Sequence, residues 1–178
     1  MTEKDIVNLI QNDEWMMRVL RVARDLNLPQ WMIGAGFVRN KVWDYLVGNV
    51  RDSVDTPDID LVYFDPNGND EKADEKLSEK LKAETGINWE IVNEHHAHVW
   101  NNFPPYSSTE DAISQWPETV TAIGVSLDKN EKLTLFAPYG IEDLVNFIVR
   151  PSPNFNGGID KVRERVQKKR LGQKMAKN

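Results

Sequence analysis

Three acidic residues, on two segments predicted as β-strands, have the types and spacing to hold metal ions. Asp58 and Asp60 alternate with apolar residues in the stretch 58–64 (DIDLVYF), and alternate side chains of a strand share one face of a sheet. Glu90 lies inside a second apolar stretch, 88–92 (NWEIV). If the two strands pair, the three carboxylates form an oxygen-rich site of the kind that Mg²⁺ or Mn²⁺ prefers.

A glycine-rich stretch precedes the acidic pair. The short apolar run 31–33 (WMI) turns at Gly34, Ala35 and Gly36 into a predicted helix. Small residues let the backbone approach a phosphate closely, and a helix N-terminus favours negative charge. Arg39, on the first turn of that helix, is placed to reach a phosphate oxygen. These four residues are therefore the candidate nucleotide-binding positions.

Nucleotidyl transfer is the reaction that needs both features. Moving a nucleoside monophosphate from a nucleoside triphosphate (NTP) requires a neutralised α-phosphate, an activated acceptor oxygen and a stabilised pyrophosphate. Two metal ions about 4 Å apart, held by carboxylates on rigid elements, serve all three needs. Asp58 and Asp60 would share the ions, and Glu90 would complete the set and help to activate the attacking hydroxyl. Each motif is weak alone, and their combination carries the prediction.

Alternating helices and strands surround these motifs. Helical spacing and capping signals predict helices over 14–26, 38–46, 70–84, 107–116, 140–149 and 159–170. Short apolar runs bounded by turn residues predict strands over 31–33, 58–64, 88–92, 120–127 and 133–136. The fold class is therefore α/β (α+β), with a mixed sheet flanked by helices that back one of its faces.

Whole-chain properties set the class of protein. With 178 residues, 40% hydrophobic residues and six tryptophans, we expect one domain over 1–178, with a helical N-terminus at 1–28. The sequence has no cysteine, which excludes disulfides and thiolate zinc sites. No run approaches the roughly 20 apolar residues that span a membrane, so we expect a cytoplasmic protein without a membrane partner.

Charge is distributed unevenly along the chain. Residues 159–178, a basic C-terminal helix and tail, hold eight Lys or Arg against two acidic residues, so this segment is +6 and the rest of the chain is −12. A body that acidic repels a long polyanion, and long nucleic acid is an unlikely partner. The basic segment is typical of a solvated helix face, with phosphate or RNA contact as the alternative.

The glycine-rich and acidic motifs together resemble a known signature. GAGFVR at 34–39, followed by DIDL at 58–61, is similar to the signature of the DNA polymerase β-like nucleotidyltransferase superfamily. The Phe-Val-Arg helix start resembles that of the tRNA CCA-adding enzymes. The resemblance implies a polymerase β-like fold, NTP as substrate, a two-metal site at Asp58, Asp60 and Glu90, and a nucleotide loop at Gly34 and Ala35.

Further motifs resemble a bacterial family of uncharacterised nucleotidyltransferase-like proteins over residues 15–165. They include WEIVN at 89–93, PYSS at 105–108 and APYGIEDL at 137–144. Two departures bear on the phosphate loop: Ala35 stands where the superfamily usually has a second Gly or Ser, and residues 51–56 lengthen the gap before the acidic pair. No CCA-type head or body domain follows, so template-like base selection and tRNA binding are not implied.

A histidine cluster lies just after the Glu90 strand. It comprises His95, His96 and His98. Zinc binding by His96 and His98 is conceivable, but no cysteine joins them and their spacing does not suit one helix face. His98, which matches the family pattern, is a candidate substrate contact or a partner of the site carboxylates, and a structural role is the alternative.

Three functions remain open at this stage. The first is a metal-dependent transferase that moves NMP to a hydroxyl of an unknown small-molecule or protein acceptor. The second is a catalytically inactive module that binds nucleotide or phosphate on the same fold. The third is an interaction protein that uses the tryptophans and the stretch 104–106 (PPY) as a surface. Specificity is expected in the loops at 48–57 and 99–109, and the sequence does not indicate the oligomeric state.

Overall fold

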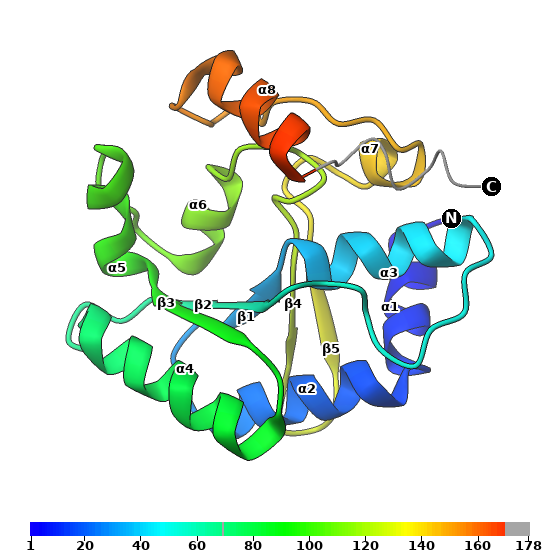
Figure 1. The fold of residues 1–178 in the computed structure, drawn as a ribbon, viewed down its shortest axis with the longest axis horizontal. Helices are drawn as coiled ribbons and strands as arrows, with labels where there is room; N and C mark the ends of the chain where they lie inside the picture. Colours follow the sequence, from blue (N-terminus) through cyan, green and yellow to red (C-terminus); the bar gives the residue numbers. More distant parts are fainter. Residues whose placement is uncertain (69, 170–178) are drawn as a thin grey trace.

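The computed structural model describes residues 1–68 and 70–169, which fold around a five-stranded sheet (Figure 1). In chain order the elements are α1 (Glu3–Gln11), α2 (Glu14–Asp25), β1 (Met32–Gly34), α3 (Gly36–Leu46), β2 (Ile59–Tyr63), α4 (Glu71–Thr85), β3 (Trp89–Asn93), α5 (Glu94–Ala97), the 3₁₀ helix η1 (His98–Asn101), α6 (Thr109–Ser114), β4 (Gly124–Leu127), β5 (Leu133–Phe136), α7 (Glu142–Val145) and α8 (Gly158–Lys169). Among the described helices, none has the length and apolar character that crossing a bilayer requires.

The sheet is mixed, as predicted. Its strand order is β3-β2-β1-β4-β5. β2 and β3 run parallel and are connected through α4, whereas the other neighbouring pairs are antiparallel. The parallel pair places the predicted acidic strands side by side, in the arrangement that the candidate metal site requires.

One face of the sheet carries the main hydrophobic core. Ile59, Leu61 and Tyr63 of β2 point to this face, where they pack with apolar side chains of α1, α2, α3 and α4. The opposite face is covered in part, because Val62 packs with Met32 and with Ile113 of α6. The prediction that helices back one face is therefore corrected: α6 also packs on the second face, and the acidic residues lie on that same face.

β3 is an edge strand whose outer side is occupied by side chains of α4. The backbone N–H of Ile91 donates to Ser78 Oγ (3.2 Å), and that of Asn93 donates to Asp74 Oδ2 (2.8 Å). Asp74 is buried and also accepts the hydroxyl of Tyr63 (2.7 Å). These contacts satisfy edge amides without a further strand and fix β3, with Glu90, against α4.

Three segments differ from the sequence-based prediction. β4 begins at Gly124, not at residue 120, because buried Glu118 and Thr121 form a hydrogen-bonded turn before it. α7 ends at Val145, and Phe147 has φ of 58°, which cannot continue a helix. The sequence analysis missed α5 and η1, although Asn93 caps α5 by accepting the N–H of His95 (3.2 Å).

Candidate functional site

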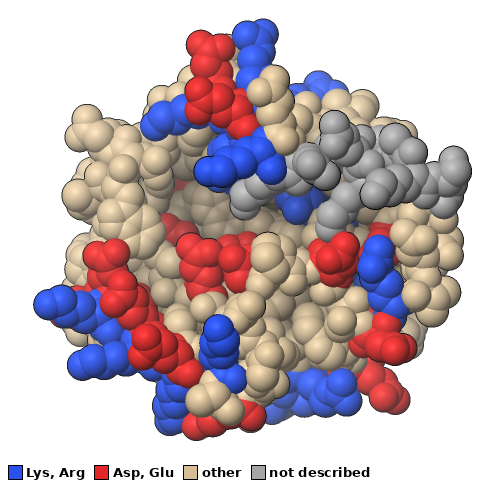
Figure 2. Space-filling model, in the orientation of Figure 1, with Lys and Arg blue, Asp and Glu red and all other residues tan. Residues whose placement is uncertain are grey.

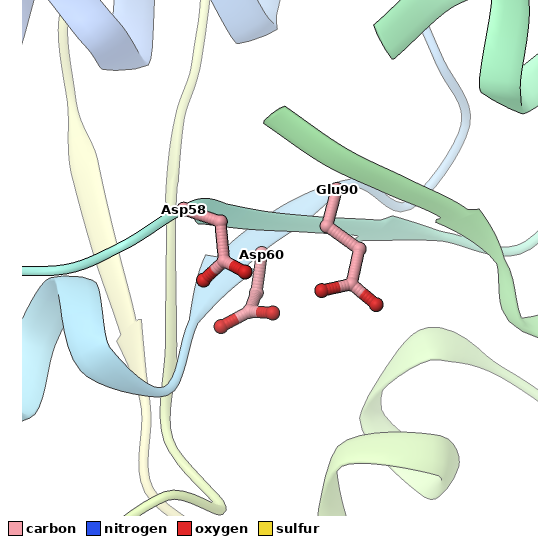
Figure 3. A group of neighbouring side chains, drawn as sticks. All are labelled: Asp58, Asp60 and Glu90. Atoms are coloured by element: carbon pink, nitrogen blue, oxygen red, sulfur yellow. The ribbon is translucent and has the colours of Figure 1, made fainter. Parts of the chain in front are cut away.

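The three predicted metal ligands lie together on one face of the sheet. Asp58 directly precedes β2, Asp60 lies within it, and Glu90 is the register partner of Asp60 on the parallel strand β3. One oxygen from each of the three carboxylates lies within 4.8 Å of the others. Figure 3 shows that the three side chains point the same way from the two strands. Glu90 is exposed, and the two aspartates are half-buried.

This donor set suits a hard divalent cation. All three groups offer carboxylate oxygens, which Mg²⁺ and Mn²⁺ prefer over softer metals. Among the described residues, this is the one group of three or more acidic, histidine or cysteine side chains that could hold a metal ion. The geometry therefore fits the metal that the sequence predicts, and the ligand role of each residue remains a prediction.

Two of these carboxylates, Asp60 and Glu90, line a cleft of about 520 Å³. Asp60, Glu90 and Glu94 lie along it on the sheet side, and Lys161 and Arg165 of α8 line it as well. Figure 2 shows a hollow in this face of the molecule, with acidic side chains on one side and basic ones on the other. Acidic side chains and two basic side chains thus border the same space, a distribution that would suit a metal-bound polyphosphate.

A buried ion pair holds α8 in this position. Arg165 Nε donates to Glu118 Oε1 at 2.9 Å, and the Glu118 side chain is 0% exposed. The Thr121 hydroxyl donates to the other carboxylate oxygen at 2.7 Å. Val162, also on α8, is buried at the same junction. The basic helix therefore has a docked face as well as a solvated one. Residues 170–178 of the predicted basic tail lie outside the described residues.

Only the middle residue of the glycine-rich loop lines the cleft. A Cβ at Gly34 would lie 2.7 Å from the Ile123 carbonyl oxygen and 2.7 Å from the Trp116 ring, so this glycine permits close packing. A Cβ at Gly36 would lie 2.7 Å from Thr56 Oγ1. Ala35 is the residue that faces the cleft. The α3 N-terminus that follows it has no side-chain cap, and contact of this loop with a nucleotide remains a prediction.

Ala35 has an unusual backbone conformation. Its φ is 51° and its ψ is −119°, a combination that glycine adopts far more easily than alanine. Its N–H donates to the Ile123 carbonyl (3.2 Å), and its carbonyl accepts the N–H of Arg39 (3.1 Å). The loop thus has a glycine-type backbone geometry although the sequence has alanine there.

Arg39 is buried instead of facing the cleft. Its side chain donates to Asn40 Oδ1 (3.1 Å) and its guanidinium lies 5.4 Å from the Trp43 ring centroid. Burial lowers the pKa of Arg39 to about 10, and the negative charges of Glu118 and Asp60 oppose that shift. Arg39 therefore supports the acidic site electrostatically from within the protein, and direct phosphate contact remains a prediction.

Glu94 is a buried carboxyl group on the cleft that the sequence analysis did not select. Burial raises its pKa to about 8, and the charges of Asp60 and Glu90 raise it further, whereas a hydrogen bond from Trp116 lowers it. The group is therefore mostly protonated at neutral pH. The signal that could have found it is its position, four residues after Glu90, where β3 ends and α5 begins.

The histidines lie beside the site and do not join the carboxylates. His95 packs edge-on against Phe64 (5.6 Å between ring centroids), and His98 packs against Tyr106 (6.1 Å). His98 Nδ1 is buried without a hydrogen-bond partner among the described residues. Within the described part of the chain, neither His96 nor His98 belongs to a group of three possible metal ligands. Substrate contact by His98 remains a prediction.

The comparisons with known proteins identify the family. The model of a nucleotidyltransferase family matches residues 21–177. The chain belongs to the nucleotidyltransferase family. A protein solved by NMR and described as revealing a CCA-adding enzyme head domain has 32% sequence identity and a TM-score of 0.86, and the match covers 97% of this chain and 92% of that one. Among curated proteins, none matches the chain.

Other solved structures share the nucleotidyltransferase fold. A CCA-adding enzyme in complex with CTP matches with a TM-score of 0.60 and 16% identity, and one in complex with ATP with 0.53 and 17%. The matches cover 100% and 99% of this chain but 43% and 40% of those enzymes. Because the identities are 16% and 17%, these matches show the fold alone. The chain itself is similar to a domain described as a CCA-adding enzyme head domain, whereas the expectation that no CCA-type head or body domain follows the motifs stays a prediction.

Proposed function

We propose that this nucleotidyltransferase moves NMP from an NTP to a hydroxyl group and depends on Mg²⁺ or Mn²⁺. The observation that carries the proposal is the convergence of Asp58, Asp60 and Glu90 on one side of a cleft that Lys161 and Arg165 also line. Divalent cations bound there would neutralise the α-phosphate and lower the pKa of the attacking hydroxyl. The acceptor oxygen then forms a bond to the α-phosphorus, the bond to the β-phosphate oxygen breaks, and pyrophosphate leaves.

Each residue has a role that follows from its position. Asp58, just before β2, and Asp60, within it, are half-buried and would hold the cations in a fixed place. Glu90 is the most exposed of the three and is placed to receive the proton of the acceptor hydroxyl. Lys161 and Arg165 neutralise the β- and γ-phosphates and the departing pyrophosphate.

The acceptor is best assigned to a small molecule or a protein. Similarity to a CCA-adding enzyme head domain makes a tRNA acceptor the natural alternative. Against it stands the charge of residues 1–158, which total −12 and repel a long polyanion. A compact hydroxyl-bearing acceptor avoids that repulsion and needs access only to Glu90 and the α-phosphate.

The two other candidate functions, an interaction protein and a binding module without chemistry, have less support. The large exposed hydrophobic side chains of the described residues are scattered over the N-terminus, α3 and the segment after it, η1, the segment after α7, and α8, which does not favour a large interaction surface. A binding module without chemistry would need the same cleft but not all three carboxylates. Retention of the complete acidic set therefore favours the enzyme.

The test separates binding from chemistry. Calorimetry with each of the four NTPs, with Mg²⁺ and with chelator, should show metal-dependent binding to the wild type. Transfer from α-labelled NTP to fractionated small molecules and proteins, with pyrophosphate release, reports chemistry. We expect Asp60→Asn to lower transfer by at least about 100-fold, because loss of even an outer partner of a metal site costs about 10–100-fold.

Glu110→Gln is the matched control, because this exposed carboxylate on α6 does not line the cleft and its loss should leave transfer unchanged. Metal-dependent binding without turnover in any fraction would favour the inactive binding module. Undiminished transfer by folded Asp60→Asn would refute the assignment.

A further inference from the structure

We propose that the nucleobase of the bound NTP stacks on an aromatic wall of the cleft formed by Trp100, Phe103 and Phe155. This inference rests on the proposed function and adds to it the part of the cleft that recognises the base. The three rings come from η1, from the segment after it, and from the segment before α8, and all three line the cleft.

The wall joins segments that are far apart in the sequence. The rings of Phe103 and Phe155 meet edge to face, with centroids 5.8 Å apart and planes at 81°. Phe103 also packs against the buried cluster that contains Ala97 and Tyr106, so its position is fixed by the α5 and α6 region. Trp100 is 55% exposed. A large aromatic side chain left this open beside a cleft is available to a planar ligand.

The charges of the cleft place the phosphates away from this wall. Arg165 pairs with Glu118, and the charges of both, with that of Asp60, act on the same buried Arg39. The guanidinium of Arg165 is therefore held at Glu118, and Arg165 lines the same cleft as Asp60 and Glu90. α8 starts at Gly158, directly after the Phe155 segment, and a helix rises 1.5 Å per residue, so Lys161 stands roughly 5 Å and Arg165 roughly 10 Å beyond the helix start along its axis. One helix thus joins the aromatic wall to the phosphate-binding charges.

This separation matches the two ends of a nucleotide. The polyphosphate needs the cations and the metal ligands, and the uncharged planar base needs aromatic surface. The wall lies in the 99–109 region, where the sequence predicts specificity, and in the segment before α8. Stacking tolerates any base because every base has a π-face. We therefore expect all four NTPs to bind, with discrimination left to polar neighbours such as Asn101, which also lines the cleft.

The experiment compares ATP with inorganic tripolyphosphate, both with Mg²⁺, by calorimetry on the full chain. Trp100→Ala removes an exposed ring, and Phe103→Leu keeps apolar volume but loses the π-face. Tyr45→Ala is the control, because Tyr45 is 58% exposed and lies outside the cleft. We expect each wall variant to weaken the binding of ATP roughly 5- to 100-fold. The binding of tripolyphosphate and the midpoint of urea unfolding should stay unchanged. The control should bind both ligands like the wild type.

Each other outcome has a definite meaning. If the wild type binds ATP with Mg²⁺ and both wall variants bind it equally well, the base lies elsewhere and the inference is wrong while the proposed function stands. Equal weakening of ATP and tripolyphosphate would also overturn it, because the rings would then act on the phosphate site or on the fold. If the wild type binds neither ligand, the proposed function fails and the inference fails with it.

Discussion

Replacing Arg165 by methionine should destabilise the protein more than replacing its partner Glu118 by glutamine. Glu118 is a fully buried carboxylate, and Arg165 Nε donates to it at 2.9 Å. Removing one member of a buried pair costs about 3–5 kcal/mol, because the other charge stays buried without compensation. Two groups soften the loss: Thr121 still donates to Glu118, and the positive charge of Arg39 acts on it. We therefore expect Arg165→Met to cost about 2–3 kcal/mol.

The reverse change leaves Arg165, a charge that water can reach, and it takes from buried Arg39 one of two compensating negative charges while that of Asp60 remains. The Arg165 side chain is 37% exposed, so in Glu118→Gln the guanidinium keeps part of its hydration and the amide can still bond with Thr121. The cost should be about 1.5 kcal/mol, the lower end of the range for one hydrogen bond to a charged group, because the guanidinium regains water. The double variant should lose less than the sum of the two single losses, because neither charge is then left unpaired.

Urea unfolding followed by tryptophan fluorescence measures all three variants. Arg163→Met is the matched control, because Arg163 is 68% exposed, lies on the same helix and pairs only locally with Asp160 among the described residues; it should change stability by less than about 0.5 kcal/mol. A larger loss in Glu118→Gln than in Arg165→Met, or strictly additive losses in the double variant, would refute the reasoning.

Three further changes test other features of the site. Ala35→Gly should stabilise the protein by about 1 kcal/mol, because release of the strained backbone (φ 51°, ψ −119°) outweighs the added freedom of the unfolded chain; a lowered melting temperature would contradict this. Gly34→Ala should cost about 1–3 kcal/mol in urea, because its Cβ would lie 2.7 Å from both a backbone oxygen and the Trp116 ring; wild-type stability would show that the ring moves freely. Glu94 has a folded pKa of about 8, above its ordinary value of 4.5, so in this pH range the folded state binds more protons than the unfolded state. The free energy of unfolding of the wild type, relative to that of Glu94→Gln, should therefore fall by as much as about 3 kcal/mol between pH 5 and pH 8. Parallel pH profiles for the two proteins would show that burial does not shift this group.

Local patterns predicted much of the fold. The period-two alternation around Asp58 and Asp60 reveals both the strand and the face that its carboxylates share, because alternation is a property of the strand alone. The helix between β2 and β3 is the crossover that a parallel pair needs, but the sequence left open whether the two strands are neighbours in the sheet. Glu90 is placed beside Asp60 by elements that are each visible in the sequence.

Tertiary contacts decide what the sequence could not show. Arg39 has the right position on its helix, but packing against Trp43 turns it into the protein. The cations that line the cleft, Lys161 and Arg165, are about a hundred residues from the acidic pair and reach it only because Glu118 anchors α8. The basic composition of residues 159–178 marked the segment, but a count of charges carries no information about which face docks.

The contacts between α4 and β3 also bear on how the protein behaves in a crowded solution. An open strand edge is a template on which a second chain can add a strand, and that is a common route to aggregation. Here Ser78 and Asp74 occupy edge amides of β3, so an incoming strand would have to displace a helix before it could pair. The protein can therefore keep Glu90 on the outermost strand, open to solvent and substrate, without offering that strand to its neighbours.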